Sequence, residues 1–206
     1  MAVPVEPPPG VTCYSGGEND FMGRWQTWRG RFLAPLLAVL ARVRVTPSHL
    51  TLLSLLAGLA FCPVFLWYSR PAAFALLLTH LLLDALDGPL ARFTRRASNR
   101  GSFSDTMADQ VVVTFSTVTL IHTGHAGAWP GGLYVFFYCM VVIFAMVRNA
   151  LAIPYAWLIR PRLLVYAWIP VEVYLWRGSL DPILWIFSVL LAVKMLTGFI
   201  QIRKRI

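Results

Sequence analysis

Long apolar stretches constrain the fold of this chain more than any other feature. Of its 206 residues, 58% are hydrophobic, which is too apolar for a soluble globular protein of this length. Several stretches approach the roughly 20 residues that a helix needs to cross a bilayer. We therefore predict an all-α integral membrane protein of one domain, with six transmembrane helices near residues 47–68, 72–93, 102–123, 131–153, 162–176 and 182–201.

Two further segments precede the first predicted span. Residues 1–20 are rich in Pro and Gly and lack the basic and apolar regions of a signal peptide, so we expect a flexible tail. In residues 21–45, apolar side chains recur at helical spacing, which predicts an amphipathic helix lying in the membrane interface. Thr46 and Pro47 are typical of a helix start, so the six-helix membrane domain is expected to cover residues 46–206.

The basic residues indicate how the chain is oriented. The net charge is +9, but the Lys and Arg residues lie between apolar spans rather than along a soluble face, which favours anionic lipid headgroups over nucleic acid. With six spans, nearly all of them fall on the side of the two termini and the 92–100 connection, whereas Arg70 and Arg177 fall on the other side. The positive-inside rule then places both termini in the cytoplasm, in a protein of the inner membrane.

Four of the nine acidic residues lie within one window of 26 residues: Asp84, Asp87, Asp105 and Asp109. A carboxylate in a bilayer costs roughly 2.5–3.5 kcal/mol on insertion scales, so four together indicate a functional site. Their spacing of three and four residues on successive predicted helices directs them to one point. Divalent cations would relieve their mutual repulsion, and oxygen ligands suit Mg²⁺ or Mn²⁺ better than zinc.

Three other interpretations of the four aspartates are less favoured by the sequence. Salt bridges between helices would need more nearby cations than the sequence offers outside one loop. A cation transporter would place carboxylates near the middle of the membrane or at both faces, whereas these four cluster at predicted cytoplasmic helix ends. A noncatalytic scaffold would not need all four.

The run D-x-x-D-G-x-x-A-R-x8-G-x3-D-x3-D, from Asp84 to Asp109, resembles the signature of the CDP-alcohol phosphotransferases (CDP-alcohol phosphatidyltransferases) at all eight fixed positions. The resemblance implies a six-helix membrane enzyme, usually a homodimer, that binds two Mg²⁺ or Mn²⁺ ions. It implies that Asp84, Asp87 and Asp105 are metal ligands and that Asp109 is the general base, which also contacts a metal. The CDP group would be bound by Gly88, Ala91, Arg92, Gly101 and Ser102.

The resemblance also implies the reaction, transfer of a phosphatidyl group from CDP-diacylglycerol to a small hydroxylated acceptor with release of CMP. Family members with phosphorylated acceptors hold the phosphate with basic residues of later helices; Arg148 is preferred here, ahead of Arg160 and Arg162. A phosphorylated polyol, such as glycerol 3-phosphate or inositol phosphate, is the preferred acceptor. Serine, inositol and the reverse arrangement, with CDP-choline or CDP-ethanolamine as donor and a lipid alcohol as acceptor, stay open.

Several other polar residues are expected to be structural. We expect His80 to be packed and hydrogen-bonded, Glu172 to have a structural role within the fifth span, and His125 to be solvated at the opposite membrane face. The three cysteines, Cys13, Cys62 and Cys139, show no paired spacing and are expected to be reduced packing residues.

Overall fold

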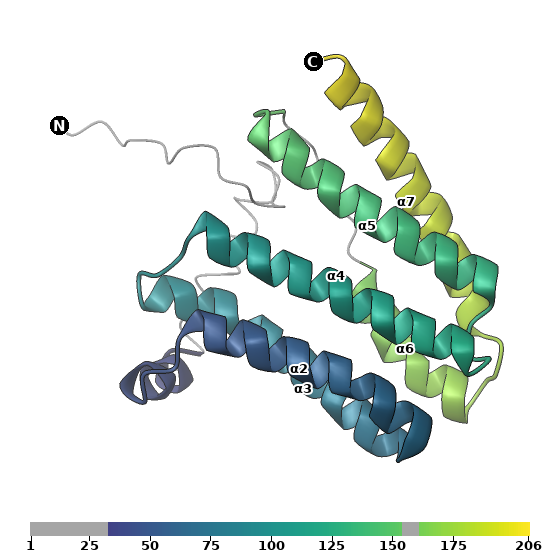
Figure 1. Ribbon diagram of the computed structural model, residues 1–206, viewed down its shortest axis with the longest axis horizontal. Helices are drawn as coiled ribbons and strands as arrows, with labels where there is room; N and C mark the ends of the chain where they lie inside the picture. The colour runs from purple at the N-terminus through teal and green to yellow at the C-terminus, as the bar shows by residue number, and fades with distance from the viewer. Residues whose placement is uncertain (1–32, 154–160) are drawn as a thin grey trace.

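The computed structural model describes residues 33–153 and 161–206, and these residues form seven helices and no strand (Figure 1). A short helix, Leu33–Arg42, comes first. It is followed by α2 (Pro47–Trp67), α3 (Arg70–Phe93), α4 (Asn99–His122), α5 (Ala128–Ala150), α6 (Arg162–Tyr174) and α7 (Leu180–Arg203). The predicted tail over residues 1–20 and residues 21–32 of the predicted interfacial helix lie outside the described residues.

The helices α2 to α7 coincide with the six predicted spans to within a few residues, but only part of the prediction about spanning is confirmed. Within the described residues, four helices are long and apolar enough to cross a membrane, namely α2, α3, α5 and α7. Helix α4 has the length but carries the polar run from Asn99 to Gln110, and α6 has only 13 residues. The chain is an integral membrane protein, but the count of six complete spans is not established.

Short polar caps determine where the helices start. The side chain of Thr46 accepts a hydrogen bond from the backbone N–H of His49 at 3.3 Å, and Pro47 occupies the first turn of α2, as the sequence predicts. Ser69 and Ser98 cap α3 and α4 in the same way, each accepting from a backbone N–H three residues later. These caps satisfy backbone donors at the helix ends and keep the connections between α2, α3 and α4 short.

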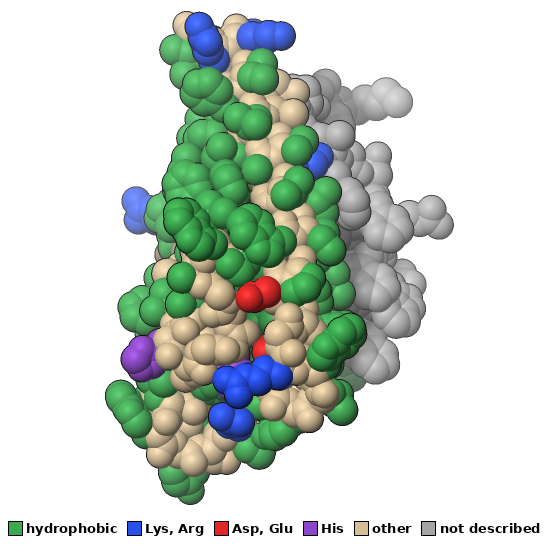
Figure 2. Space-filling view, turned by 90° about the vertical axis from the view of Figure 1, so that its right-hand side faces the viewer, with side chains coloured by type: hydrophobic (Ala, Val, Ile, Leu, Met, Phe, Trp, Pro, Cys, Tyr) green, Lys and Arg blue, Asp and Glu red, His purple; other side chains and the backbone are tan. Residues whose placement is uncertain are grey.

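Helix α2 packs on both α3 and α4, while α5 packs on α7 and on α4 (Figure 1). Gly58 on α2 allows the close approach of α4, since a Cβ atom there would lie 2.5 Å from a methyl group of Val112, which is fully buried. The face shown in Figure 2 is covered mainly by hydrophobic side chains, and acidic side chains emerge only in a small area beside basic ones. Such an apolar exterior suits contact with lipid.

The prediction that His125, in the α4–α5 connection, is solvated is wrong. His125 is 6% exposed rather than solvated, and its ring lies edge-on to Phe65. Burial lowers the pKa of His125, and the positive charges of Arg70 and Arg177 lower it further, so the imidazole is neutral at pH 7. The sequence carried no sign of this burial, because the residue lies in a connection rather than in a helix.

Glu172 and His80 have the structural roles expected of them. The buried Glu172 carboxylate accepts hydrogen bonds from the backbone N–H groups of Gly178 at 2.7 Å and Leu180 at 2.9 Å. It therefore anchors the start of α7 to α6. His80 is buried against α2, with its Nδ1 atom 2.8 Å from the hydroxyl oxygen of Ser54.

The contact between α2 and α4 leads to the first prediction. Gly58→Ala should lower the free energy of unfolding by about 1–3 kcal/mol, because overpacking a buried site forces neighbours to move. Gly132→Ala is the matched control: nothing lies within 4 Å of its added Cβ, and replacing a helical glycine should raise stability by roughly 0.5–1 kcal/mol. Thermal unfolding of both variants in detergent measures the difference. A Gly58 variant as stable as the wild-type protein would mean that α2 and α4 are free to separate.

Candidate active site

The four aspartates come together where α3 ends and α4 begins. Asp84 and Asp87 lie in the C-terminal half of α3, Asp105 and Asp109 lie in the first half of α4, and the short connection after Phe93 reverses the chain. Carboxylate oxygens of Asp84, Asp105 and Asp109 all lie within 4.8 Å of one another. The cluster that the sequence predicts therefore forms, with contributions from two helices.

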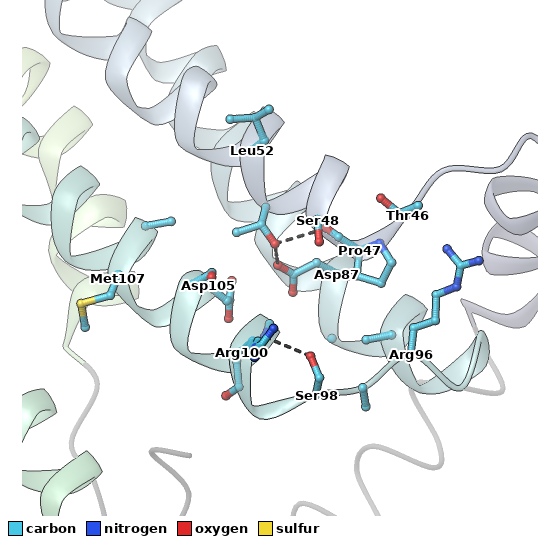
Figure 3. A pocket seen from close by; sticks show the side chains of 18 of the residues that line it. Thr46, Pro47, Ser48, Leu52, Asp87, Arg96, Ser98, Arg100, Asp105 and Met107 are labelled. Atoms are coloured by element: carbon cyan, nitrogen blue, oxygen red, sulfur yellow. Dashed lines mark hydrogen bonds between the residues drawn. The ribbon is translucent and has the colours of Figure 1, made fainter. Parts of the chain in front are cut away.

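Asp87 lies on the side of the cluster that faces α2. Its side chain is 6% exposed, and the hydroxyl of Thr51 donates a hydrogen bond to Asp87 Oδ2 at 2.9 Å (Figure 3). The same hydroxyl lies 3.2 Å from the backbone carbonyl of Pro47. Thr51 was not assigned to the site from the sequence, although it lies one turn into the helix that begins at the Thr46 cap. It fixes the orientation of the Asp87 carboxylate.

A cavity of about 810 Å³ opens between α2, the end of α3 and the start of α4. All five residues that the sequence predicts for CDP binding line it, together with Asp87 and Asp105: Gly88, Ala91, Arg92, Gly101 and Ser102. Asp87 and Asp105 project toward the same space, with Arg96 on one side of them and Leu52 on the other (Figure 3). The cavity thus has a polar part rich in arginine and small residues, and an apolar part formed by Leu52, Leu55, Met107 and Val111.

Asp84 and Asp109 face the opposite side of the cluster, where Arg162 contacts both. Arg162 is the first residue of α6; its Nη2 donates to Asp84 Oδ2, and its Nη1 pairs with Asp109 Oδ1. The three side chains are only 13%, 14% and 17% exposed. The family resemblance offers Arg162 only as a candidate for the acceptor phosphate, and the sequence disfavours salt bridges to the aspartates. Its direct pairing with Asp84 and Asp109 is therefore a finding of the structure.

Of the other two arginines proposed for the acceptor phosphate, only Arg148 belongs to the part of the chain that the structure describes. Arg148 is buried in the last turn of α5, and Arg160 lies outside the described residues. The structure therefore brings Arg162, rather than the preferred Arg148, into direct contact with the aspartates.

Buried polar side chains of α3, α5 and α6 lie around Arg162, on the side of the aspartates that faces α6. Tyr166 lies one turn further along α6, with its ring centroid 6.3 Å from that of His80 and its hydroxyl 3.5 Å from Ser116 Oγ. Tyr134 and Tyr138 on α5 are also buried, with ring centroids 5.8 Å apart, and both lie within electrostatic range of the guanidinium. Over the described ranges, His80 Nε2 and Tyr134 Oη have no hydrogen-bond partner. These two atoms are thus available to form hydrogen bonds with a ligand on the Arg162 side of the cluster.

The donor set fits a divalent cation. Three carboxylates from two helices can offer oxygen atoms to one point, and an ion such as Mg²⁺ or Mn²⁺ prefers oxygen ligands of this kind. Asp87, which the sequence also predicts as a ligand, lies beside these three carboxylates, and the hydrogen bond from Thr51 fixes the orientation of its carboxylate.

Comparison with known proteins bears on the same residues. The family model described as CDP-alcohol phosphatidyltransferase matches residues 44–200, which include α2 to α6 and most of α7. The archaetidylinositol phosphate synthase of Aeropyrum pernix is 36% identical over 124 residues, which are 60% of this chain and 57% of that protein. The CDP-diacylglycerol–serine O-phosphatidyltransferase of Mycobacterium bovis is 32% identical over 111 residues, which are 53% of this chain and 39% of that protein.

A third relative is the CDP-diacylglycerol–glycerol-3-phosphate 3-phosphatidyltransferase of Cereibacter sphaeroides. It is 36% identical over 88 residues, which are 41% of this chain and 39% of that protein. The chain thus spans from 39% to 57% of the length of these three relatives. No solved structure is significantly similar to it.

The Thr51–Asp87 contact leads to the second prediction. Thr51→Val, which keeps the shape but removes the hydroxyl, should weaken Mn²⁺ binding about 10- to 100-fold, the usual loss for an outer-shell partner. Asp105→Asn should weaken it further, since it removes a ligand. Asp181→Asn is the control, because Asp181 lies at the other end of the bundle and accepts a hydrogen bond from Gly127. Isothermal titration of the purified protein with Mn²⁺ gives the constants. Unchanged affinity in both the Thr51 and Asp105 variants would contradict a metal site here.

Proposed function

This chain belongs to the CDP-alcohol phosphatidyltransferase family, and we propose that it transfers a phosphatidyl group from CDP-diacylglycerol to a small hydroxylated acceptor, releasing CMP. Enzymes of this family use a CDP-linked lipid donor and an alcohol acceptor in membranes and generally depend on a divalent metal. The observation that carries the proposal is the cavity beside the aspartates, which is lined by all five residues that the family resemblance assigns to CDP binding.

The shape of the cavity supports a donor that carries acyl chains. Its polar part offers Arg92, Arg96 and Arg100 to a pyrophosphate, and arginine forms paired hydrogen bonds with phosphate oxygens. Its apolar part ends at Leu52, whose side chain is 54% exposed on the outside of α2. A diacylglycerol group would therefore leave the cavity directly toward the lipid. CDP-choline, which has no acyl chains, would leave this apolar part unused.

The proposed chemistry assigns each aspartate a role. Asp84, Asp87 and Asp105 would hold two Mg²⁺ or Mn²⁺ ions with a contribution from Asp109, and such ions would neutralise the pyrophosphate during displacement of CMP. The acceptor oxygen bonds to the phosphorus of the phosphatidyl group as the bond to the CMP oxygen breaks. Asp109 takes the proton of the attacking hydroxyl, because it lies on the side of the cluster away from the donor cavity.

A phosphorylated polyol is the preferred acceptor. Two of the three relatives described above carry phosphorylated groups in their names, inositol phosphate and glycerol 3-phosphate, while the third carries serine. Arg162 supports this choice, because its guanidinium already lies beside Asp109, where the acceptor hydroxyl must be deprotonated. We assign Arg162 the leading role in binding the acceptor phosphate, with Arg148 and Arg160 as further candidates.

The third prediction tests the reaction. Purified protein given CDP-diacylglycerol, Mg²⁺ and a panel of glycerol 3-phosphate, inositol phosphate, inositol and serine should release CMP, fastest with one of the two phosphorylated acceptors. Asp109→Asn should lower the turnover number by roughly 100- to 10,000-fold, the usual contribution of a general base, while CDP-diacylglycerol still binds. Asp181→Asn should retain wild-type turnover. Failure of every acceptor to stimulate CMP release would refute the proposed function, and a fully active Asp109 variant would refute the base.

We also propose that the protein is a homodimer of the inner membrane whose site faces the cytoplasm. The dimer follows from the family resemblance alone. The orientation rests on the basic residues of the α3–α4 connection and the C-terminal end of α7, compared with Arg70 and Arg177 at the opposite end of the helices.

The fourth prediction tests the orientation. A membrane-impermeant thiol reagent applied outside the cell should label a cysteine introduced at Ala128 and fail to label one at Ala97, in a background without the three native cysteines. Both positions are exposed at connections, on opposite ends of α4. Labelling at Ala97 without labelling at Ala128 would invert the proposed topology.

A further inference from the structure

Arg162 occupies a position that the metal site also requires. We propose that Arg162 is an exchangeable counter-cation: its guanidinium neutralises Asp84 and Asp109 before metal binds, and metal binding displaces it toward the acceptor. This inference rests on the proposed function, because it concerns the same aspartates.

The contacts show that the guanidinium bridges two helices. One terminal nitrogen binds Asp84 on α3 and the other binds Asp109 on α4, so each arm of the fork holds a carboxylate from a different helix. Both carboxylates and the guanidinium are largely shielded from solvent. Without this cation, the buried negative charges of Asp84 on α3 and Asp109 on α4 would repel one another.

The same carboxylates are two of the three that converge for a metal. Oxygens of Asp84, Asp105 and Asp109 lie within 4.8 Å of one another, and Arg162 already uses one oxygen of Asp84 and one of Asp109. A divalent cation among these oxygens would face the positive guanidinium at short range in a poorly hydrated place, where like charges repel strongly. Two divalent ions would already neutralise the four carboxylates, so a guanidinium at Asp84 and Asp109 would then be in excess. The guanidinium is the cation that can move away, because it is carried on a flexible side chain.

Displacement would give Arg162 a new partner nearby. The side chain begins on the first turn of α6, beside the buried side chains of Tyr138 and Tyr166, and both phenols lie within electrostatic range of it. A guanidinium released there would need an anion, and a phosphorylated acceptor supplies one in a geometry that arginine binds with two hydrogen bonds. Metal binding would thereby create the acceptor site, so that the acceptor binds after the metal.

The test compares Mn²⁺ affinity in wild-type protein and Arg162→Gln, by isothermal titration in detergent without substrates. If the metal displaces the guanidinium, the variant should bind Mn²⁺ at least about tenfold more tightly than the wild type. The reason is that the metal no longer has to break charge-assisted hydrogen bonds. Arg177→Gln, which removes an exposed arginine at the other end of the bundle, should bind Mn²⁺ as the wild type does. Weaker or unchanged binding in Arg162→Gln would overturn the proposal and make Arg162 a permanent partner that orients the ligands.

Loss of the buried cation could also unfold the variant, so stability provides a second measurement. Exchange predicts that Mn²⁺ raises the unfolding temperature of Arg162→Gln by more than it raises that of the wild type; an equal or smaller rise would overturn it. Arg162→Lys, which keeps the charge but loses the fork, should bind Mn²⁺ with intermediate affinity. CMP release by the wild-type protein in the same preparation tests the proposed function separately, so failure of one proposal is distinguishable from failure of the other.

Discussion

The mutual repulsion of four carboxylates at one end of a membrane-embedded bundle is the constraint on which the rest of the structure depends. Negative charges this close cannot persist in a poorly hydrated place without cations, and the chain arranges its compensation on two sides. On the side of α2, Asp87 is held by the Thr51 hydroxyl and faces a cavity lined by arginines. On the side of α6, Asp84 and Asp109 are bridged by Arg162. The cluster therefore separates the proposed donor site from the proposed acceptor site.

The packing of the helices places this cluster and keeps the cavity open. Gly58 brings α2 against Val112 of α4, and the same two helices line the cavity at Thr51 and Asp105. A larger residue at position 58 would move α2 as a unit, and with it the hydroxyl that orients Asp87. At the far end of the bundle, Glu172 holds the start of α7 to α6 through backbone N–H groups. Helix α6, and with it Arg162, is thereby fixed from the end opposite to the site.

Much of this arrangement could be predicted from the sequence, because the relevant signals are local. The Thr46-Pro47 cap marks the start of α2, and the apolar runs give the positions of all six helices from α2 to α7. The aspartates and the five residues expected to bind CDP lie within 26 residues, so one helical turn and one chain reversal suffice to bring them together. The family resemblance makes Arg162 one of three candidates for the acceptor phosphate. No local signal predicts its pairing with Asp84 and Asp109 or the burial of His125, because each depends on contacts between segments far apart in the chain.

The same difference explains why the donor could be inferred further than the acceptor. The proposed CDP site is built from neighbouring turns of α3 and α4 and from the adjacent α2, so its chemistry can be read from one short motif. The proposed acceptor side would be assembled from His80 on α3, Tyr138 on α5, and Arg162 and Tyr166 on α6, which no short motif contains. Relatives whose names contain inositol phosphate, serine and glycerol 3-phosphate are all similar to parts of this chain. If the donor chemistry is common to them, then acceptor choice must reside in residues that only the tertiary structure brings together, and the environment of Arg162 is where this chain would make that choice.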